Sequence, residues 1–131
     1  MLTKEDIQSF IDRLEGGGVE SQELEAGLWR VLSQTGAEVV VHYAPPVVIL
    51  RLRVMEPPAS DAKQKGLYRQ LLEFNATDLI HGSYGLEGDH IVLTDALELA
   101  NLDYSEFEAS FDSITLALAS HLSALAPFRE R

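Results

Sequence analysis

Two histidines on either side of an expected β-hairpin are the residues of this chain that first suggest metal binding. His81 and His90 flank the hairpin, and Asp89 is a candidate third ligand. A two-residue turn at Glu87-Gly88 or Gly88-Asp89, however, leaves the two histidines about 13–20 Å apart along the strands, whereas zinc–ligand bonds are about 2 Å long. The spacing therefore predicts that His81 and His90 are ordinary surface or packed histidines, and no metal site is expected.

Other reactive patterns are also in the wrong context for chemistry. Gly82-x-x-Gly85-x-x-Gly88 runs along a strand into a hairpin, whereas phosphate-binding loops connect a strand to the start of a helix. The chain has no cysteine and no Gly-x-Ser-x-Gly motif, which excludes a thiol nucleophile and the usual serine elbow. Four acidic residues lie in the first turns of the last expected helix, where the positive end of the helix dipole stabilises negative charge: Asp103, Glu106, Glu108 and Asp112. A helix-stabilising role is expected for them. We predict no catalytic residue and no cofactor.

The composition predicts a single soluble domain. The chain has 131 residues, of which 46% are hydrophobic and 24% charged, and this balance supports one core spanning 1–131. A net charge of -11 repels nucleic acid and anionic membranes, so neither is expected as a partner. No secretory signal or membrane-spanning run is recognisable, and the lack of cysteine suits a reducing compartment, so we expect a cytoplasmic protein.

The order of hydrophobic patterns predicts an α+β fold. The expected elements are a helix over 4–15, three strands over 28–32, 39–43 and 47–55, a helix from a Ser60 cap to about Asn75, a hairpin over 80–86 and 90–94, and a long final helix. The final helix is expected to begin with a Ser105-x-x-Glu108 capping box and to stop at Pro127. It carries one apolar stripe, made of Phe107, Phe111, Ile114, Leu118, Leu122 and Leu125.

The strand over 47–55 alternates in a way that indicates two different faces. Its apolar residues alternate with Arg51 and Arg53, so one face is expected to be buried and the other to meet water or a partner. Gly66 within the second helix costs about 1 kcal/mol relative to alanine and predicts close packing, either within the fold or across a dimer. The candidate partner contacts are Val39, Val41, Val47, Ile49, Arg51 and Arg53.

The segment from Leu67 to Leu102 resembles a known family. The matching motifs are Leu71-Leu72-x-x-Asn75, His81-Gly82-Ser83-Tyr84-Gly85-Leu86, Ile91-Val92-Leu93 and Leu97-x-Leu99-x-x-Leu102, and they resemble the YbjN and CesT-like families with the type III secretion chaperone-like fold. The resemblance implies a homodimeric, acidic, cytoplasmic chaperone-like protein. Such a protein holds an extended segment of a protein partner and has no catalytic residues.

The leading hypothesis is therefore a non-enzymatic protein-binding module that captures a peptide segment on sheet and helix surfaces. A second hypothesis is a small ligand- or metal-binding domain, or an enzyme, that uses the His81, Tyr84 and His90 region. A third is a regulator of another protein that acts through a locally basic stretch, which consists of Arg51, Arg53, Lys63, Lys65 and Arg69.

Overall fold

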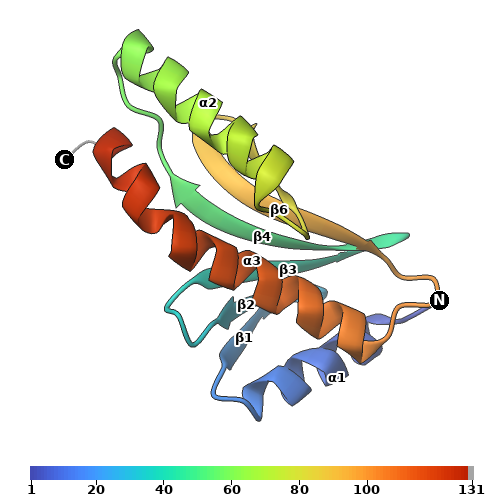
Figure 1. Cartoon of the computed structure of the whole chain (residues 1–131). Helices are drawn as coiled ribbons and strands as arrows, with labels where there is room; N and C mark the ends of the chain where they lie inside the picture. The colour runs from blue at the N-terminus through green and yellow to red at the C-terminus, as the bar shows by residue number, and fades with distance from the viewer. Residues whose placement is uncertain (130–131) are drawn as a thin grey trace.

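Three α-helices and one antiparallel sheet make up the part of the chain that the computed structural model describes, residues 1–129. The sheet has six strands in the order β1-β2-β3-β4-β6-β5 (Figure 1). The elements are α1 (Lys4–Glu15), β1 (Glu20–Glu25), β2 (Leu28–Leu32), β3 (Glu38–Ala44), β4 (Val47–Met55), α2 (Asp61–Thr77), β5 (Ser83–Glu87), β6 (His90–Glu98), α3 (Tyr104–Leu125) and the short 3₁₀ helix η1 (Ala126–Phe128). The predicted α+β class is confirmed.

Strand β1 is the one strand that the sequence prediction missed. Five of its six side chains are exposed, so buried and exposed residues do not alternate along it. Its sequence therefore has the pattern of an acidic loop. The strand is held by its backbone, which pairs antiparallel with β2 from Glu20 opposite Leu32 to Glu25 opposite Leu28. Four strands, β1 to β4, therefore lie between α1 and α2, where the sequence predicted three. Backbone pairing needs no hydrophobic side chain, so the sequence pattern does not reveal β1.

Helix boundaries follow the capping residues. Helix α1 begins after the Thr3 cap and spans the predicted residues. Helix α3 begins two residues before the predicted box, because Asp103 is the N-cap and Glu106 returns a hydrogen bond to it. The prediction of a Ser105–Glu108 box is wrong. Leu102 is buried just before the helix, so the chain must turn into α3 directly after it.

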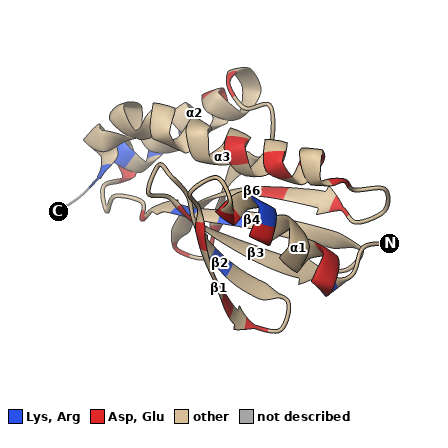
Figure 2. Cartoon of the chain, turned by 90° about the horizontal axis from the view of Figure 1, so that it is seen from below, with Lys and Arg blue, Asp and Glu red and all other residues tan. Residues whose placement is uncertain are grey.

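One side of the sheet packs against all three helices. Alternate residues of β2, β3, β4 and β6 point into this layer, and the buried faces of the helices meet them in a single cluster. Figure 2 shows α2 and α3 above the sheet, with α1 in front of it. The core of this layer includes Ile7, Ile11, Trp29, Val31, Val39, Val41, Leu50, Leu52, Leu67, Leu93, Phe107, Phe111 and Ile114, each with 2% or less of its surface exposed.

The stripe of α3 is confirmed except at one position. Leu122 has 42% of its surface exposed, whereas the neighbouring His121 has only 5% exposed and takes its place in the buried row. His121 lies three residues after Leu118 and four before Leu125, which is the spacing of one helix face. Within residues 1–129, none of the helices, α3 included, combines the length and apolar character needed to cross a bilayer.

Two glycines lie where other groups approach the backbone closely. A Cβ on Gly82 would lie 2.6 Å from the Thr94 carbonyl oxygen, and its φ of +77° is strained for other residues. Gly66 faces the ring of Phe128 in η1, which would lie 3.1 Å from an added Cβ. The close packing predicted at Gly66 therefore occurs within the fold.

Phe111→Ala should lower the free energy of unfolding by about 3–5 kcal/mol, because it removes a ring from the centre of the core. Urea denaturation followed by circular dichroism measures this. Leu116→Ala is the matched control, since Leu116 lies on the same helix but has 58% of its surface exposed, and it should change stability by about 0.5 kcal/mol or less. Equal losses in both variants would contradict the assigned core.

Candidate functional site

The side of the sheet that faces away from the helices is the first candidate surface. No helix within residues 1–129 covers it, and half-buried apolar side chains alternate on it with charged ones. We call this surface the open face, and define it from the strand registers as Leu28, Arg30, Leu32, Glu38, Val40, His42, Val47, Ile49, Arg51, Arg53 and Val92. Its apolar residues are distributed over β2, β3, β4 and β6, and most lie opposite a polar or charged residue of the next strand.

The six predicted partner contacts are divided between the two sides of the sheet. Val47, Ile49, Arg51 and Arg53 lie on the open face, as the alternation of β4 indicates. Val39 and Val41 are completely buried in the layer between sheet and helices. They cannot contact a partner at the surface, because consecutive strand residues point to opposite sides and their partners across the ladder are the core residues Leu52 and Leu50.

The charges of the open face are only partly matched within the chain. Arg30 lies 3.4 Å from a Glu38 oxygen, and Arg51 Nε lies 3.1 Å from Glu87 Oε2. The Arg51 Nε atom is buried, but it is not aligned for a hydrogen bond with any described group. Arg53 is exposed and makes no ion pair with any residue from 1 to 129. The open face therefore offers guanidinium donors beside apolar side chains.

The basic stretch of the sequence does not form one surface. Arg51 and Arg53 are on the open face, whereas Lys63, Lys65 and Arg69 belong to α2 on the helical side of the sheet. Arg69 also pairs with Glu73 at 3.2 Å, one turn along the helix. A partner that recognised all five cations would have to contact both sides of the molecule.

The outer surface of α2 carries a second apolar area. Tyr68, Leu72 and Ala76 line a shallow hollow of about 660 Å³, and Leu72 has 66% of its surface exposed. Charged residues of both signs surround this hollow: Asp61, Lys65, Arg69 and Glu73. An exposed apolar centre with a charged rim is typical of protein contact surfaces.

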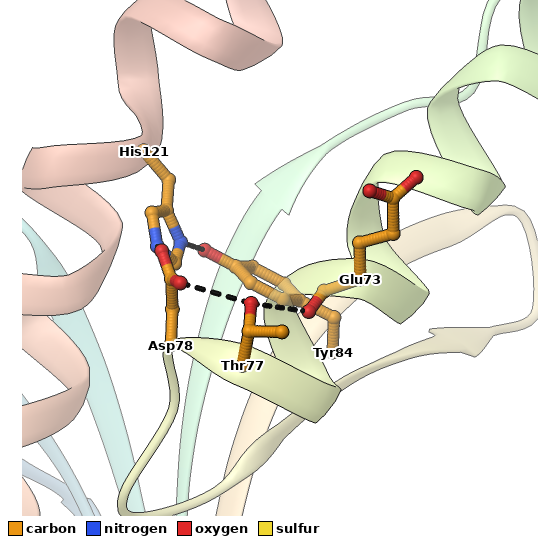
Figure 3. Close-up of polar contacts among 5 residues, drawn as sticks. All are labelled: Glu73, Thr77, Asp78, Tyr84 and His121. Carbon is orange, nitrogen blue, oxygen red and sulfur yellow. Dashed lines mark hydrogen bonds and ion pairs between the residues drawn. The ribbon is translucent and has the colours of Figure 1, made fainter.

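A polar cluster around the buried Tyr84 and His121 joins α2, β5 and α3. The Tyr84 hydroxyl lies 2.7 Å from His121 Nδ1, and His121 Nε2 lies 3.1 Å from Asp78 Oδ2 (Figure 3). The Thr77 hydroxyl lies 3.0 Å from Asp78 Oδ1 and 2.8 Å from the Glu73 carbonyl oxygen. The imidazole also stacks on Phe74, with ring centroids 3.6 Å apart.

The chemistry of these groups assigns the hydrogen-bond directions. The Asp78 carboxylate can only accept, so His121 Nε2 donates to it, and in the tautomer that carries its proton on Nε2 the Nδ1 atom accepts from the phenol. Burial, and then the charge of Asp78, raise the pKa of Tyr84, which keeps the phenol protonated and able to donate. Tyr84 and His121 have only 6% and 5% of their surfaces exposed. The cluster thus fastens three elements together, with Tyr84 and His121 in the interior and Asp78 at the surface.

The two histidines that first suggested metal binding lie beside different carboxylates. His81 Nδ1 lies 3.8 Å from Asp95, and His90 Nδ1 lies 3.7 Å from Glu56. Glu87 pairs with His90 across the hairpin, so the turn is Gly88-Asp89, one of the two predicted turns. No group of three or more metal-ligating side chains occurs among the described residues.

Acidic groups also gather beside the first half of α3. The Tyr104 hydroxyl donates to Glu108 at 3.0 Å, and the Arg13 guanidinium lies 3.7 Å above the Tyr104 ring. Partial burial, and then the charge of Glu108, raise the pKa of Asp112. Burial and the hydrogen bond to Glu108 likewise raise the pKa of Tyr104. These residues line a hollow of about 360 Å³ in which negative charge predominates.

Sequence reasoning did not connect His121 to Tyr84. A signal was present, because His121 lies in phase with the apolar stripe of α3, where a polar side chain must find buried partners. The identity of those partners was not available, since Asp78 is 43 residues away in the chain.

Comparisons with known proteins fit this architecture. The family model CesT_Tir_1 matches residues 2–131. No curated protein matches the sequence significantly.

Among solved structures, the chain is similar to one in the heterodimeric ExoU-SpcU complex from the type III secretion system of Pseudomonas aeruginosa. The two are 18% identical with a TM-score of 0.66, over 89% of this chain and 94% of that chain. YbjN from E. coli, described as a putative transcription regulator, is 12% identical with a TM-score of 0.66, over 94% and 93%. A chain of the HopA1-SchA chaperone–effector complex is 10% identical with a TM-score of 0.63, over 89% and 93%. At these identities the likeness establishes the fold.

Tyr84→Phe should lower the free energy of unfolding by about 1–3 kcal/mol, because it leaves the buried Nδ1 of His121 without its donor. Urea denaturation at neutral pH measures the loss. Tyr68→Phe removes a hydroxyl that bonds to no described group and should change stability by about 0.5 kcal/mol or less. If the two variants were equally stable, Tyr84 would not be the link between α3 and β5.

Proposed function

Because this chain belongs to the CesT_Tir_1 family of type III secretion chaperones, we propose that it is a non-enzymatic, chaperone-like protein that holds an extended segment of a partner protein. The observation that carries the proposal is the open face. Half of the side chains of a six-stranded sheet are left without a covering layer, although Val47, Ile49 and Leu28 are apolar and only half-buried. A partner segment that covered them would bury this area.

The partner would combine apolar and acidic side chains at the open face. Ile49 and its neighbours on β2 and β3 supply the apolar contact, while Arg53 supplies a guanidinium that has no ion pair with any described residue. Arginine binds a carboxylate with two parallel hydrogen bonds, so an aspartate or glutamate in the partner would match it. The similar HopA1-SchA structure is a chaperone–effector complex, and this likeness supports a protein-binding role of the same kind.

The alternative functions have less support. In the Tyr84 cluster, Tyr84 and His121 are buried and already bond to each other and to Asp78, which leaves these two side chains little access to a ligand. A regulator that acts through the basic stretch would need cations that lie together, and these residues are divided between β4 and α2.

We also propose that the protein is a homodimer in which the outer surface of α2 contacts its copy. A two-fold axis brings the same surface of each subunit together, so residues of both charge signs around an apolar centre can pair with one another. Leu72 lies at that centre, and Lys65 and Glu73 stand on either side of it along the helix.

The double variant Ile49→Thr/Arg51→Thr should reduce capture of partner proteins several-fold, because it removes apolar area and a guanidinium from the open face while keeping residues that favour strands. Affinity purification from native lysate with quantitative mass spectrometry measures the change. Leu116→Ala, on the helical side, is the control and should leave capture unchanged. Identical partners and amounts for the double variant would exclude the open face as the binding surface.

Leu72→Asp should convert the dimer to a monomer, since it introduces a charge at the centre of the α2 contact. Light scattering coupled to size-exclusion chromatography measures the mass. The control is Leu116→Asp, because Leu116 is similarly exposed but lies on α3. A wild-type monomer at all concentrations, or a Leu72→Asp dimer, would refute this interface.

A further inference from the structure

The two edges of the sheet are protected in different ways. At the β5 edge the side chain of Asn75, from α2, bonds to the backbone of a single strand residue. Its Oδ1 accepts from the Tyr84 N–H at 2.8 Å, and its Nδ2 donates to the Tyr84 carbonyl oxygen at 3.2 Å. Both groups would otherwise point away from β6 and be available to another strand.

A primary amide presents one donor and one acceptor side by side, which is what an adjacent antiparallel strand offers to each outward-facing residue. Asn75 therefore stands where the next strand would lie. Outward-facing residues alternate along an edge, so Leu86 is the other residue of the five-residue strand β5 whose backbone groups point outward. With Tyr84 occupied, too few free groups are left to bind an added strand.

Docking of α2 does not by itself require this amide. Leu67 and Leu71 of α2 are buried in the core, and Phe74 packs beside the Tyr84 ring with centroids 6.2 Å apart. Strand β5 also lacks lysine, proline and a bulge, which are the usual protections of an exposed edge. The amide supplies the protection that the strand sequence does not.

The β1 edge has charge in place of such a cover. Its residues include Glu20, Glu23 and Glu25 and no basic residue, and its register shifts between Glu23 and Glu25. No side chain among residues 1–129 hydrogen-bonds to the β1 backbone. Like charges opposite one another are destabilising, whereas opposite charges attract, so this edge repels the β1 edge of a second copy and favours a basic strand.

We infer that Asn75 is the residue that closes the β5 edge to added strands, so that the sheet can be extended only at the acidic β1 edge. The inference that Asn75 closes the β5 edge depends only on contacts within this chain. The basic partner strand at β1 rests on the proposed function.

Asn75→Ala tests the closure in the full chain. Alanine has a higher helix propensity than asparagine, which offsets part of the lost hydrogen bonding. The Tyr84 amide should exchange with deuterium about tenfold faster, because its hydrogen bond is gone. Sedimentation velocity should also detect assemblies larger than those of the wild type that increase with concentration.

Matched variants separate closure from a general loss of stability. Gln70→Ala, at another half-buried position of α2, should alter neither property. Adding Leu86→Pro to Asn75→Ala should abolish the extra association, since it removes the remaining outward N–H without a bond to β6. If Asn75→Ala does not fold by circular dichroism, Asn75→Asp, which keeps the acceptor and loses the donor, is judged by association alone. A folded Asn75 variant that associates like the wild type would overturn the inference.

A peptide probe tests the basic partner separately. A hexapeptide of alternating lysine and valine should shift backbone NMR signals of β1 in the wild type, and of both β1 and β5 in Asn75→Ala. The same peptide with glutamate in place of lysine should shift neither. Failure of the lysine peptide at β1 would refute the basic partner strand, whereas a β5 response in the wild type would refute the closure by Asn75.

Discussion

Burial of one side of the sheet under α1, α2 and α3 is the interaction on which the rest of the described structure depends. Trp29, Val41, Leu50 and Leu93, from four adjacent strands, all point into this layer, and Phe111 lies against it from α3 with 2% of its surface exposed. Since strand residues alternate in direction, covering one side leaves every second residue on the other. The open face is thus the direct consequence of having helices on a single side.

The polar groups around Tyr84 hold the helical layer in one arrangement. Hydrophobic contacts are tolerant of small shifts, but the Tyr84 hydroxyl, the His121 ring and the Asp78 carboxylate satisfy one another only when α2, β5 and α3 are in register. Asn75 adds a second polar tie between α2 and β5 through the backbone of the same tyrosine. Tyr84 is therefore the residue through which the position of α2 is linked to the edge of the sheet.

The distribution of charge gives each surface a different character. The chain has a net charge of -11, yet the open face presents Arg30, Arg51 and Arg53, and the rim of the α2 hollow has both signs. The β1 edge carries three glutamates and no basic residue. Long-range attraction would bring basic partners towards the molecule as a whole, while contact at the open face selects for carboxylates beside apolar side chains. A segment with both kinds of charge would suit the two surfaces together.

The sequence by itself determined the helices, five of the six strands, and the sides of β4, as the alternation around Leu50 and Arg51 correctly indicated. It also indicated the buried stripe of α3, with His121 in place of Leu122 as the exception. These features are local, because periods of two and of 3.6 residues are visible in a short window. Only the tertiary structure decided that β1 is a strand, that Val39 and Val41 are core residues, that Gly66 faces Phe128, and that Asn75 and His121 meet Tyr84. Those contacts depend on which distant segments become neighbours in the sheet and the helical layer, and no local pattern of side chains encodes that order.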